Sequence, residues 1–178
     1  MRPVSLGMNV TVDGFVAGPA GELDWIYPHI DADLLTVITG ALTAIDTMLM
    51  GRVNYEEQAA HWPSQTDPIA HLVNNHTKVV FSTTLHAVDW VNSRLATSDP
   101  AEEIAHLRQQ EGGTIGVSGG PTFAAGLLKQ GLIDELRLTI HPVALGGGTP
   151  LFSAPQKLKL LRSRSFATDA VLNTYHPA

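Results

Sequence analysis

The sequence predicts an α/β protein with a mixed, mostly parallel sheet, helices on both faces and an antiparallel hairpin at its C-terminal edge. Three observations support this prediction. Short apolar runs without alternation recur along the chain and are typical of strands that are covered on both faces. Helical stretches separate these runs, and two strand candidates adjoin near the C-terminus. With 178 residues and no linker or repeat, residues 1–178 are expected to form a single domain.

The chain opens with a strand in which apolar and polar residues alternate. The apolar members are Val4, Leu6, Met8, Val10 and Val12, and the polar members are Ser5, Gly7, Asn9 and Thr11. Because side chains alternate between the two faces of a sheet, each set is expected to occupy one face. The pair Asp13-Gly14 then predicts a turn.

Helices and further strands follow in order. Apolar residues at helical spacing predict a helix over residues 31–45, which Asp46-Thr47 is expected to end. The apolar runs that predict central strands are residues 48–50, 78–81 and 114–117. Asp99-Pro100 starts a second helix that Gly112-Gly113 ends, and a third covers residues 121–130 with Gly131 after it. Alternation over residues 135–141 predicts a strand, and residues 158–166 and 171–176 predict the final hairpin.

Composition excludes several function classes. Eleven Lys and Arg residues against seventeen Asp and Glu give a net charge of −6, which argues against a general nucleic-acid binder. The absence of cysteine excludes a disulfide framework, a zinc ribbon and a thiol nucleophile. The eight histidines show no metal-binding spacing, so no metal site is expected. No apolar run approaches the ~20 residues of a membrane span, and the N-terminus lacks a signal-peptide core, so a cytoplasmic protein is expected.

Two predicted strand-to-helix junctions carry glycine, at Gly51-Arg52 and at Ser118-Gly119-Gly120. In open α/β sheets, ligands bind at the carboxyl ends of strands, where the next helix presents free N–H groups to anions. The guanidinium of Arg52 would add a planar cation suited to phosphate. The simpler interpretation is that the glycines end strands and that Arg52 is a surface charge. Two such junctions in one small sheet favour a ligand that bears phosphate.

A third junction, Phe81-Ser82-Thr83-Thr84, offers hydroxyls that can donate to phosphate or cap a helix. The usual nucleotide fingerprints, G-x-G-x-x-G and the P-loop, are absent. A competing pattern is the G-x-S-x-G of α/β-hydrolases at residues 116–120, with Ser118 as the nucleophile. The remaining members of such a triad would come from Asp134 or Asp169 and from His141 or His176.

The order of several short motifs resembles the dihydrofolate reductase-like superfamily. The motifs are Thr11-Val12-Asp13-Gly14-Phe15, Asp24-Trp25, Gly51-Arg52-x-x-Tyr55-Glu56, Phe81-Ser82-Thr83, Gly119-Gly120 and Ile133-Asp134-Glu135-Leu136. The chain is most similar to the branch named after the C-terminal reductase domain of the bifunctional deaminase–reductase of riboflavin biosynthesis. A run that also recurs in this branch, Gly146-Gly147-Gly148, is expected to form a loop between sheet strands.

The resemblance implies an NADPH-dependent oxidoreductase that transfers hydride to a small heterocyclic or carbonyl/imine substrate, as 5-amino-6-(5-phosphoribosylamino)uracil reductase and dihydrofolate reductase do. It also implies a homodimer. The cofactor-binding residues would be Gly51, Arg52, Val53, Phe81, Ser82, Thr83, Ser118, Gly119, Gly120, Pro121 and Thr122. The arginine at position 52 would favour NADPH over NADH, and Lys78 and Arg94 are either further cations for the cofactor or solvated charges. A non-catalytic NADPH-binding protein is a further alternative.

By the same resemblance, Asp33 would be the catalytic acid, since it lies near the start of the helix after the first strand. Asp31 competes for this role, and either carboxylate can instead cap the helix. A general acid would also need a pKa raised by burial. Asn9, Asp13, Trp25 and Tyr55 are the candidate substrate-binding residues. For Asp13 the alternative is a turn residue, and for the two aromatic residues it is a place in the core.

Overall fold

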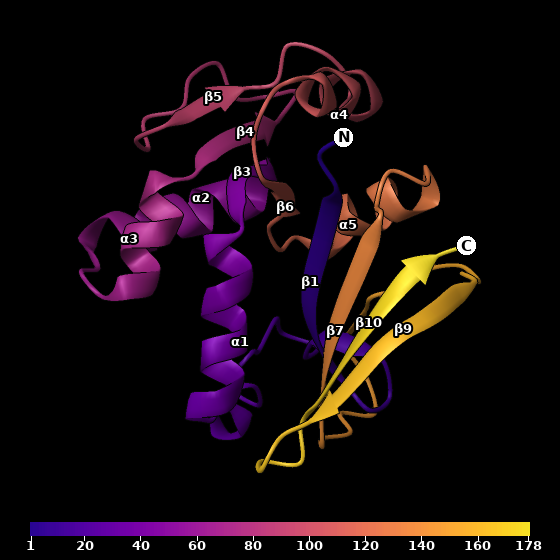
Figure 1. The fold of residues 1–178 in the computed structure, drawn as a ribbon. Helices are drawn as coiled ribbons and strands as arrows, with labels where there is room; N and C mark the ends of the chain where they lie inside the picture. The colour runs from indigo at the N-terminus through magenta and orange to yellow at the C-terminus, as the bar shows by residue number, and fades with distance from the viewer.

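The computed structural model describes residues 1–178 as an eight-stranded sheet, a small two-stranded sheet and five α-helices (Figure 1). The large sheet has the strand order β5-β4-β3-β6-β1-β7-β10-β9. Its strands are β1 (Val4–Thr11), β3 (Ile45–Gly51), β4 (Thr77–Phe81), β5 (Ser93–Leu95), β6 (Thr114–Val117), β7 (Glu135–His141), β9 (Leu158–Ser165) and β10 (Val171–Pro177). The small sheet pairs β2 (Phe15–Ala17) with β8 (Thr149–Pro150). The α-helices are α1 (Ala32–Thr43), α2 (Arg52–His61), α3 (Pro68–Asn75), α4 (Pro100–Gln109) and α5 (Pro121–Lys129), and two 3-10 turns, η1 (Tyr27–His29) and η2 (Trp62–Ser64), complete the fold.

The strand pairing confirms the predicted fold class. The neighbouring strands from β5 to β7 are all parallel, whereas β10 runs antiparallel to both β7 and β9. The predicted C-terminal hairpin is therefore β9–β10, and it forms one edge of the sheet. The three apolar runs are β3, β4 and β6, which lie beside one another between β5 and β1.

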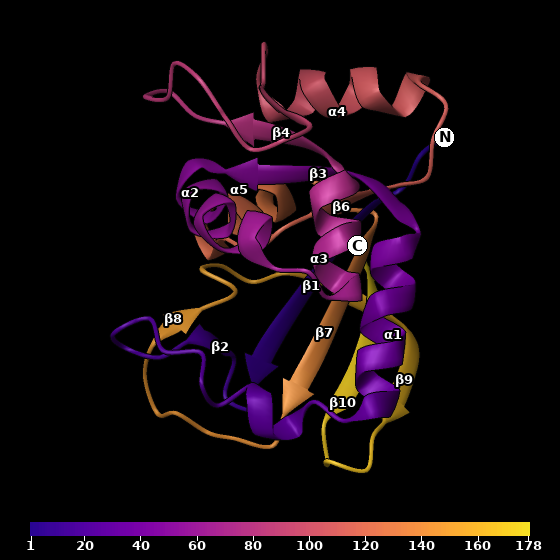
Figure 2. The ribbon, with the colours of Figure 1, turned by 90° about the vertical axis from the view of Figure 1, so that its left-hand side faces the viewer.

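Helices cover both faces of the sheet (Figure 2). The main core packs α4 and α5 against the apolar set of β1, with Val4 and Leu6 fully buried. A second core packs α2 and α3 against the other face of β3 and β4, through residues such as Met50 and Val73. The helix α1 lies on this second face and contacts the hairpin through Leu34, Phe166 and Ala170. The polar set of β1 therefore faces α1.

The helices differ from the sequence prediction at two points. The first helix ends at Thr43, and Asp46-Thr47 belongs to β3. The reason is tertiary, because the buried guanidinium of Arg2 bonds both Asp46 and Thr47 and fixes them in the strand. The helix α3 was not predicted, although Asp67 caps it and Pro68 takes its first position, which is a recognisable helix start.

The three glycines of residues 146–148 form the loop that leads into β8, and Gly148 is the one that the packing requires. A Cβ atom at Gly148 would lie 2.2 Å from the carbonyl oxygen of Ala17, and its φ of +142° is strained for any other residue. We expect Gly148→Ala to lower the free energy of unfolding by about 2 kcal/mol or more, because overpacking and backbone strain add. Urea unfolding measures this change. Gly147→Ala is the matched control, since its Cβ meets nothing within 4 Å; equal losses in both variants would contradict the explanation.

Candidate active site

Three strand-to-helix or strand-to-loop junctions lie side by side where parallel strands of the sheet end. We call this C-terminal end of the strands the cofactor edge, or simply this edge, to distinguish it from the lateral edge strand β9. The strands β4, β3 and β6 are adjacent and parallel, so their carboxyl ends reach the same side. These ends are followed by Ser82, by Arg52 at the start of α2 and by Ser118 before α5. Figure 2 shows α2 and α5 on the side toward which β3 points. The junctions that the sequence singled out thus form one continuous edge.

The helix starts at this edge differ from those of the other three α-helices. The helices α1, α3 and α4 are each capped by an aspartate side chain, namely Asp31, Asp67 and Asp99. By contrast, α2 and α5 begin after Gly51 and Gly120 and have no side-chain cap. Since the first N–H groups of a helix have no partner within it, these two neighbouring helices present free donors and positive dipole ends. Such an arrangement favours an anion at this edge.

A hydrogen-bond network joins the two uncapped helices. Gln58 in α2 is central to it: its Nε2 donates to Asn54 Oδ1 at 2.9 Å and to Ser118 Oγ, in the loop before α5, at 2.6 Å. Trp62 Nε1 in turn donates to Gln58 Oε1 at 3.1 Å. Sequence reasoning missed Asn54 and Gln58, and their helical spacing of four residues was the available signal.

The two glycines Gly119 and Gly51 are required for different reasons. Gly119 has a φ of +45°, and a Cβ atom there would lie 2.4 Å from Asn54 Nδ2. Gly51 has an ordinary backbone conformation, but its Cβ would lie 3.2 Å from that of Phe123, which stacks on Phe81 at 5.1 Å. Gly51 therefore lets α5 pack closely on β3, and Gly119 brings the loop before α5 against α2.

The other candidate cofactor residues at this edge remain accessible. Arg52 is 43% exposed and pairs with Glu56 at 2.8 Å on the same helix. An exposed ion pair of this kind is weak, so the guanidinium is free to bind a stronger anion. Val53 is 56% exposed, and Pro121 and Thr122 form the first turn of α5. Ser82 Oγ accepts from the N–H groups of Thr84 and Leu85, which orders the loop that also contains Thr83.

Lys78 and Arg94 do not reach this edge. Lys78 is fully buried, and its ammonium donates to the carbonyl oxygens of Asn74, His76 and Val91 within 3.0 Å. Burial lowers the pKa of Lys78 to about 8. Arg94 donates to the carboxylate of Glu103, which is only 4% exposed. Lys78 is therefore a buried structural cation, whereas Arg94 is 40% exposed and stays partly solvated while it pairs with Glu103.

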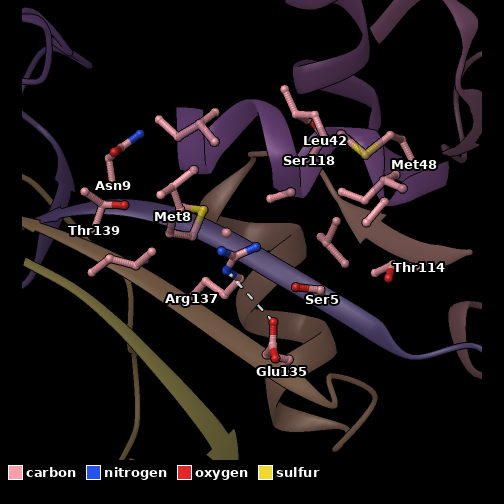
Figure 3. Close-up of a pocket in the computed structure, with 18 of the residues that line it drawn as sticks. Ser5, Met8, Asn9, Leu42, Met48, Thr114, Ser118, Glu135, Arg137 and Thr139 are labelled. Carbon is pink, nitrogen blue, oxygen red and sulfur yellow. Dashed lines mark ion pairs between the residues drawn. The ribbon is translucent and has the colours of Figure 1, made fainter. Parts of the chain in front are cut away.

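A cleft of about 450 Å³ lies between α1 and the sheet, and it extends to Ser118 and Gly119 (Figure 3). Its wall is apolar and comes from α1, with Leu34, Val37 and Ile38 among the lining residues. Its floor is polar and comes from β1 and β7. The floor residues are Ser5, Gly7, Asn9, Glu135, Arg137 and Thr139. The polar set of the first strand thus faces a cleft that is continuous with the edge described above.

At one end of the cleft, Asn9 is held by a buried histidine. His141 is fully buried, and its Nε2 lies 2.9 Å from Asn9 Oδ1. The buried Trp25 packs edge-on against the His141 ring at 5.5 Å, and the ring of His29 lies 5.8 Å away. Burial, and secondarily the nearby His29, lower the pKa of His141 to about 4, so its imidazole is neutral at physiological pH. Asn9 lines the cleft, whereas Trp25 lies behind His141 in the core.

The carboxylates near the start of α1 have separate roles. Asp31 is the helix cap, because its Oδ1 accepts from the N–H of Leu34 at 2.7 Å. Asp33 does not line the cleft: its carboxylate is 57% exposed and accepts two hydrogen bonds of 2.6 Å from Arg164 on β9. The structure therefore lacks the burial that a general acid at Asp33 requires.

Two more candidate substrate residues have structural partners. Tyr55 is buried, and its hydroxyl accepts from the N–H groups of Asp89 and Trp90, which anchors the loop before β5. The structure thus places Tyr55 in the core. Asp13 forms the predicted turn and also accepts from the N–H groups of Leu145 and Gly146. Its pKa is lowered, mainly by the hydroxyl of Thr11 and then by the Gly146 N–H, so it fastens the 145–148 loop as an ionised carboxylate.

The structure does not assemble the alternative hydrolase triad. The hydrogen-bond partner of the Ser118 hydroxyl is Gln58, while His141 bonds Asn9 and His176 bonds the carbonyl oxygen of Asp134. No three His, Asp or Glu side chains are grouped so that they hold a metal ion. None of the helices combines the length and apolar character that crossing a membrane requires.

Comparisons with known proteins agree with this fold. The chain is 35% identical over 184 residues to the uncharacterised protein YyaP of Bacillus subtilis, covering 98% of this chain and 95% of YyaP. A putative riboflavin biosynthesis protein from Shewanella sp. PV-4 has a similar structure, with a TM-score of 0.78, 23% identity and 99% of both chains covered. Dihydrofolate reductase from Enterococcus faecalis, solved with NADP(H), has a TM-score of 0.63 at 17% identity and covers 98% of this chain and 96% of that one. The RibD C-terminal domain family matches residues 2–172, and the chain belongs to this family.

Proposed function

We propose that the protein is an NADPH-dependent reductase related to the pyrimidine reductase of riboflavin biosynthesis, which reduces a small heterocyclic or carbonyl/imine substrate. The observation that carries the proposal is the pair of uncapped helix starts at Gly51 and Gly120, on neighbouring strands, in a protein whose other α-helices are capped by aspartate. Family membership supports the reading of this anion site as a cofactor site.

The residues at this edge fit a phosphorylated dinucleotide. The N–H groups at the starts of α2 and α5 would hold its pyrophosphate, with Gly119 and Gly120 allowing a close approach. Arg52, with Ser82 and Thr83 beside it, would hold the 2′-phosphate, and the exposed Val53 would cover an apolar part of the ligand. When bound, NADPH supplies a hydride. This role rests on geometry that offers both an anion site and an adjoining cleft.

The cleft is the proposed substrate site, because it reaches Ser118 and Gly119 at the cofactor edge. Asn9 would contact the substrate from the floor, held in place by His141. No aspartate or histidine lines the cleft, and its one carboxylate is that of Glu135. Glu135 pairs with Ser5 in the β1–β7 register and is therefore distant from Asn9, which pairs with Thr139. We therefore assign the proton of the reduction to water.

The exposed Leu160 and Leu161 on the edge strand β9 support the further proposal of a homodimer.

The cofactor assignment predicts a selective loss in Arg52→Gln. This variant is expected to weaken NADPH binding by about 10- to 100-fold and NADH binding by less than about threefold, because only NADPH carries the 2′-phosphate that forms charge-assisted bonds. Isothermal titration with both cofactors measures the difference. Glu56→Gln is the control, since it removes the partner of Arg52 and is expected to preserve NADPH binding.

An equal loss for NADPH and NADH in Arg52→Gln would contradict the role of Arg52. Turnover is tested separately, by NADPH oxidation with a panel of pteridines and pyrimidine ribitols. If NADPH binds and no compound in the panel is reduced, the result favours the alternative of a non-catalytic NADPH-binding protein.

A further inference from the structure

The cleft contains a cation that the proposed cofactor site does not use. Arg137 points from β7 into the cleft, where its side chain is 24% exposed. Figure 3 shows its guanidinium over β1, between Met8 and Ser5. Its nearest carboxylate is Glu135, with 3.9 Å between Nε and Oε1, which is too long for a hydrogen bond. Arg137 therefore has five N–H donors and no protein acceptor.

This lack of a partner distinguishes Arg137 from most other arginines in the chain. Arg52, Arg94, Arg108 and Arg164 each donate a hydrogen bond to a carboxylate, and the buried Arg2 does so as well. The exception besides Arg137 is Arg162, which is 74% exposed and lies 3.7 Å from Glu135. One carboxylate thus lies between two guanidinium groups, and neither contact is a hydrogen bond. Arg137 and Glu135 line the cleft and Arg162 lies beside it, so the two guanidinium groups share one carboxylate and leave one positive charge uncompensated.

The room beside Arg137 is created by a glycine. Gly7 is its partner in the β1–β7 register, and a Cβ atom at Gly7 would meet nothing within 4 Å. On the opposite side of the cleft, Val37, Ile38 and Ala41 of α1 form an apolar wall. A flat apolar group fits between this wall and the bare backbone at Gly7, with Arg137 beside it as a fork for an anion.

We propose that this half of the cleft, around Gly7 and Arg137, binds an aromatic or otherwise apolar arm of the substrate that ends in a carboxylate or phosphate. The proposal rests on the proposed function in that the arm extends from a substrate whose reacting part lies toward Ser118 and Gly119. It specifies the substrate class: an elongated molecule with an apolar body and an anionic end, which lies along β1 under α1. The anion and the cofactor phosphates are bound by different arginines.

Three naphthalene probes test this subsite in the 178-residue chain without cofactor. They are 2-naphthoate, 1-naphthyl phosphate and the neutral 1-naphthol. Fluorescence titration measures the binding of each probe. The wild type is expected to bind at least one of the two anions about tenfold or more tightly than 1-naphthol, because a charge-assisted bond to Arg137 forms only with an anion. The anion that binds more tightly identifies the end group as carboxylate or phosphate.

Two variants test the charge of Arg137 and the open space beside Gly7 separately. Arg137→Gln is expected to remove the preference for the anions, while 1-naphthol binds as before. Gly7→Val is expected to weaken all three probes by about tenfold or more, because its side chain fills the cleft. Gly40→Ala is the control, since Gly40 is exposed on α1, its Cβ meets nothing within 4 Å, and binding should match the wild type. Circular dichroism confirms that each variant is folded before binding is measured.

The same variants are titrated with NADPH, so that this proposal and the proposed function fail separately. Arg137→Gln is expected to bind NADPH like the wild type, and Arg52→Gln is expected to bind the naphthalene anions like the wild type. An unchanged preference for the anions in Arg137→Gln overturns the subsite, as does unchanged probe binding in Gly7→Val or the absence of probe binding in the wild type. If the wild type does not bind NADPH but prefers the anionic probes, the reductase proposal is overturned and the subsite is still supported.

Discussion

Gly119→Ala is expected to weaken NADPH binding by about two orders of magnitude. A Cβ atom at this position would lie 2.4 Å from Asn54 Nδ2 and 3.0 Å from Asn54 Cγ, and the φ of +45° is unfavourable for alanine. Asn54 must then move away from Gln58, which also holds the Ser118 hydroxyl. The starts of α2 and α5 then shift relative to each other, so that two charge-assisted hydrogen bonds to the cofactor phosphates are expected to be lost. At about 1.5 kcal/mol each, this loss corresponds to about 100-fold weaker NADPH binding.

Isothermal titration with NADPH measures this loss, and thermal unfolding shows how much of it comes from a less stable protein. Gly126→Ala is the matched control, because Gly126 lies in the same helix α5 and its Cβ would meet nothing within 4 Å. Alanine there is expected to leave binding unchanged and to favour the helix slightly. If Gly119→Ala binds NADPH like the wild type, the loop before α5 is not part of the cofactor site.

The protein is expected to lose stability as the pH falls from about 6.5 to 4, and His141 is the main cause. The pKa of its buried imidazole is lowered from 6.5 to about 4 in the folded state. Between these values the unfolded chain binds the proton and the folded protein does not, so acid favours unfolding. The stabilisation is complete above pH 6.5 and is lost as the pH falls toward 4. At 1.36 kcal/mol for each pH unit, the loss is about 3 kcal/mol at pH 4.

Urea unfolding at a series of pH values tests this prediction. His141→Gln is expected to remove about 3 kcal/mol of the acid dependence. Some dependence should remain, because burial also lowers the pKa of His76, which is only 5% exposed. His71→Gln is the control, since it removes an exposed histidine and leaves His141 and His76 in place. A His141→Gln profile parallel to that of the wild type would contradict the assignment.

The sequence predicts the central sheet well, because local signals and tertiary packing agree there. The apolar runs around Leu49, Val79 and Ile115 are buried strands, and Asp99 caps α4 as its sequence context predicts. The small sheet β2–β8 escapes prediction, since three- and two-residue strands leave no periodic signal. Its formation depends on the close approach of Gly148 to Ala17, which joins parts of the chain that are distant in sequence.

The candidate site is predictable at its glycines and less so at its side chains. The positions of Gly51 and Gly120 follow from the order of strands and helices. The role of Tyr55 does not, because a motif cannot show that its hydroxyl bonds the backbone of residues 89 and 90. Arg137 was also missed, since its partnership with Gly7 depends on the β1–β7 register. Register is set by the packing of the whole sheet, and a single strand does not reveal it.

NADPH is proposed to bind at the edge formed by α2, α5 and the loop after β4. Isothermal titration of the wild-type protein with NADPH, and in parallel with NADH, tests this claim most directly. We expect NADPH to bind with a dissociation constant well below about 1 mM and about tenfold or more tightly than NADH, because two helix starts and Arg52 act on its phosphates. Failure of both cofactors to bind at sub-millimolar concentration would contradict the account, and equal affinity for the two would remove the role of Arg52.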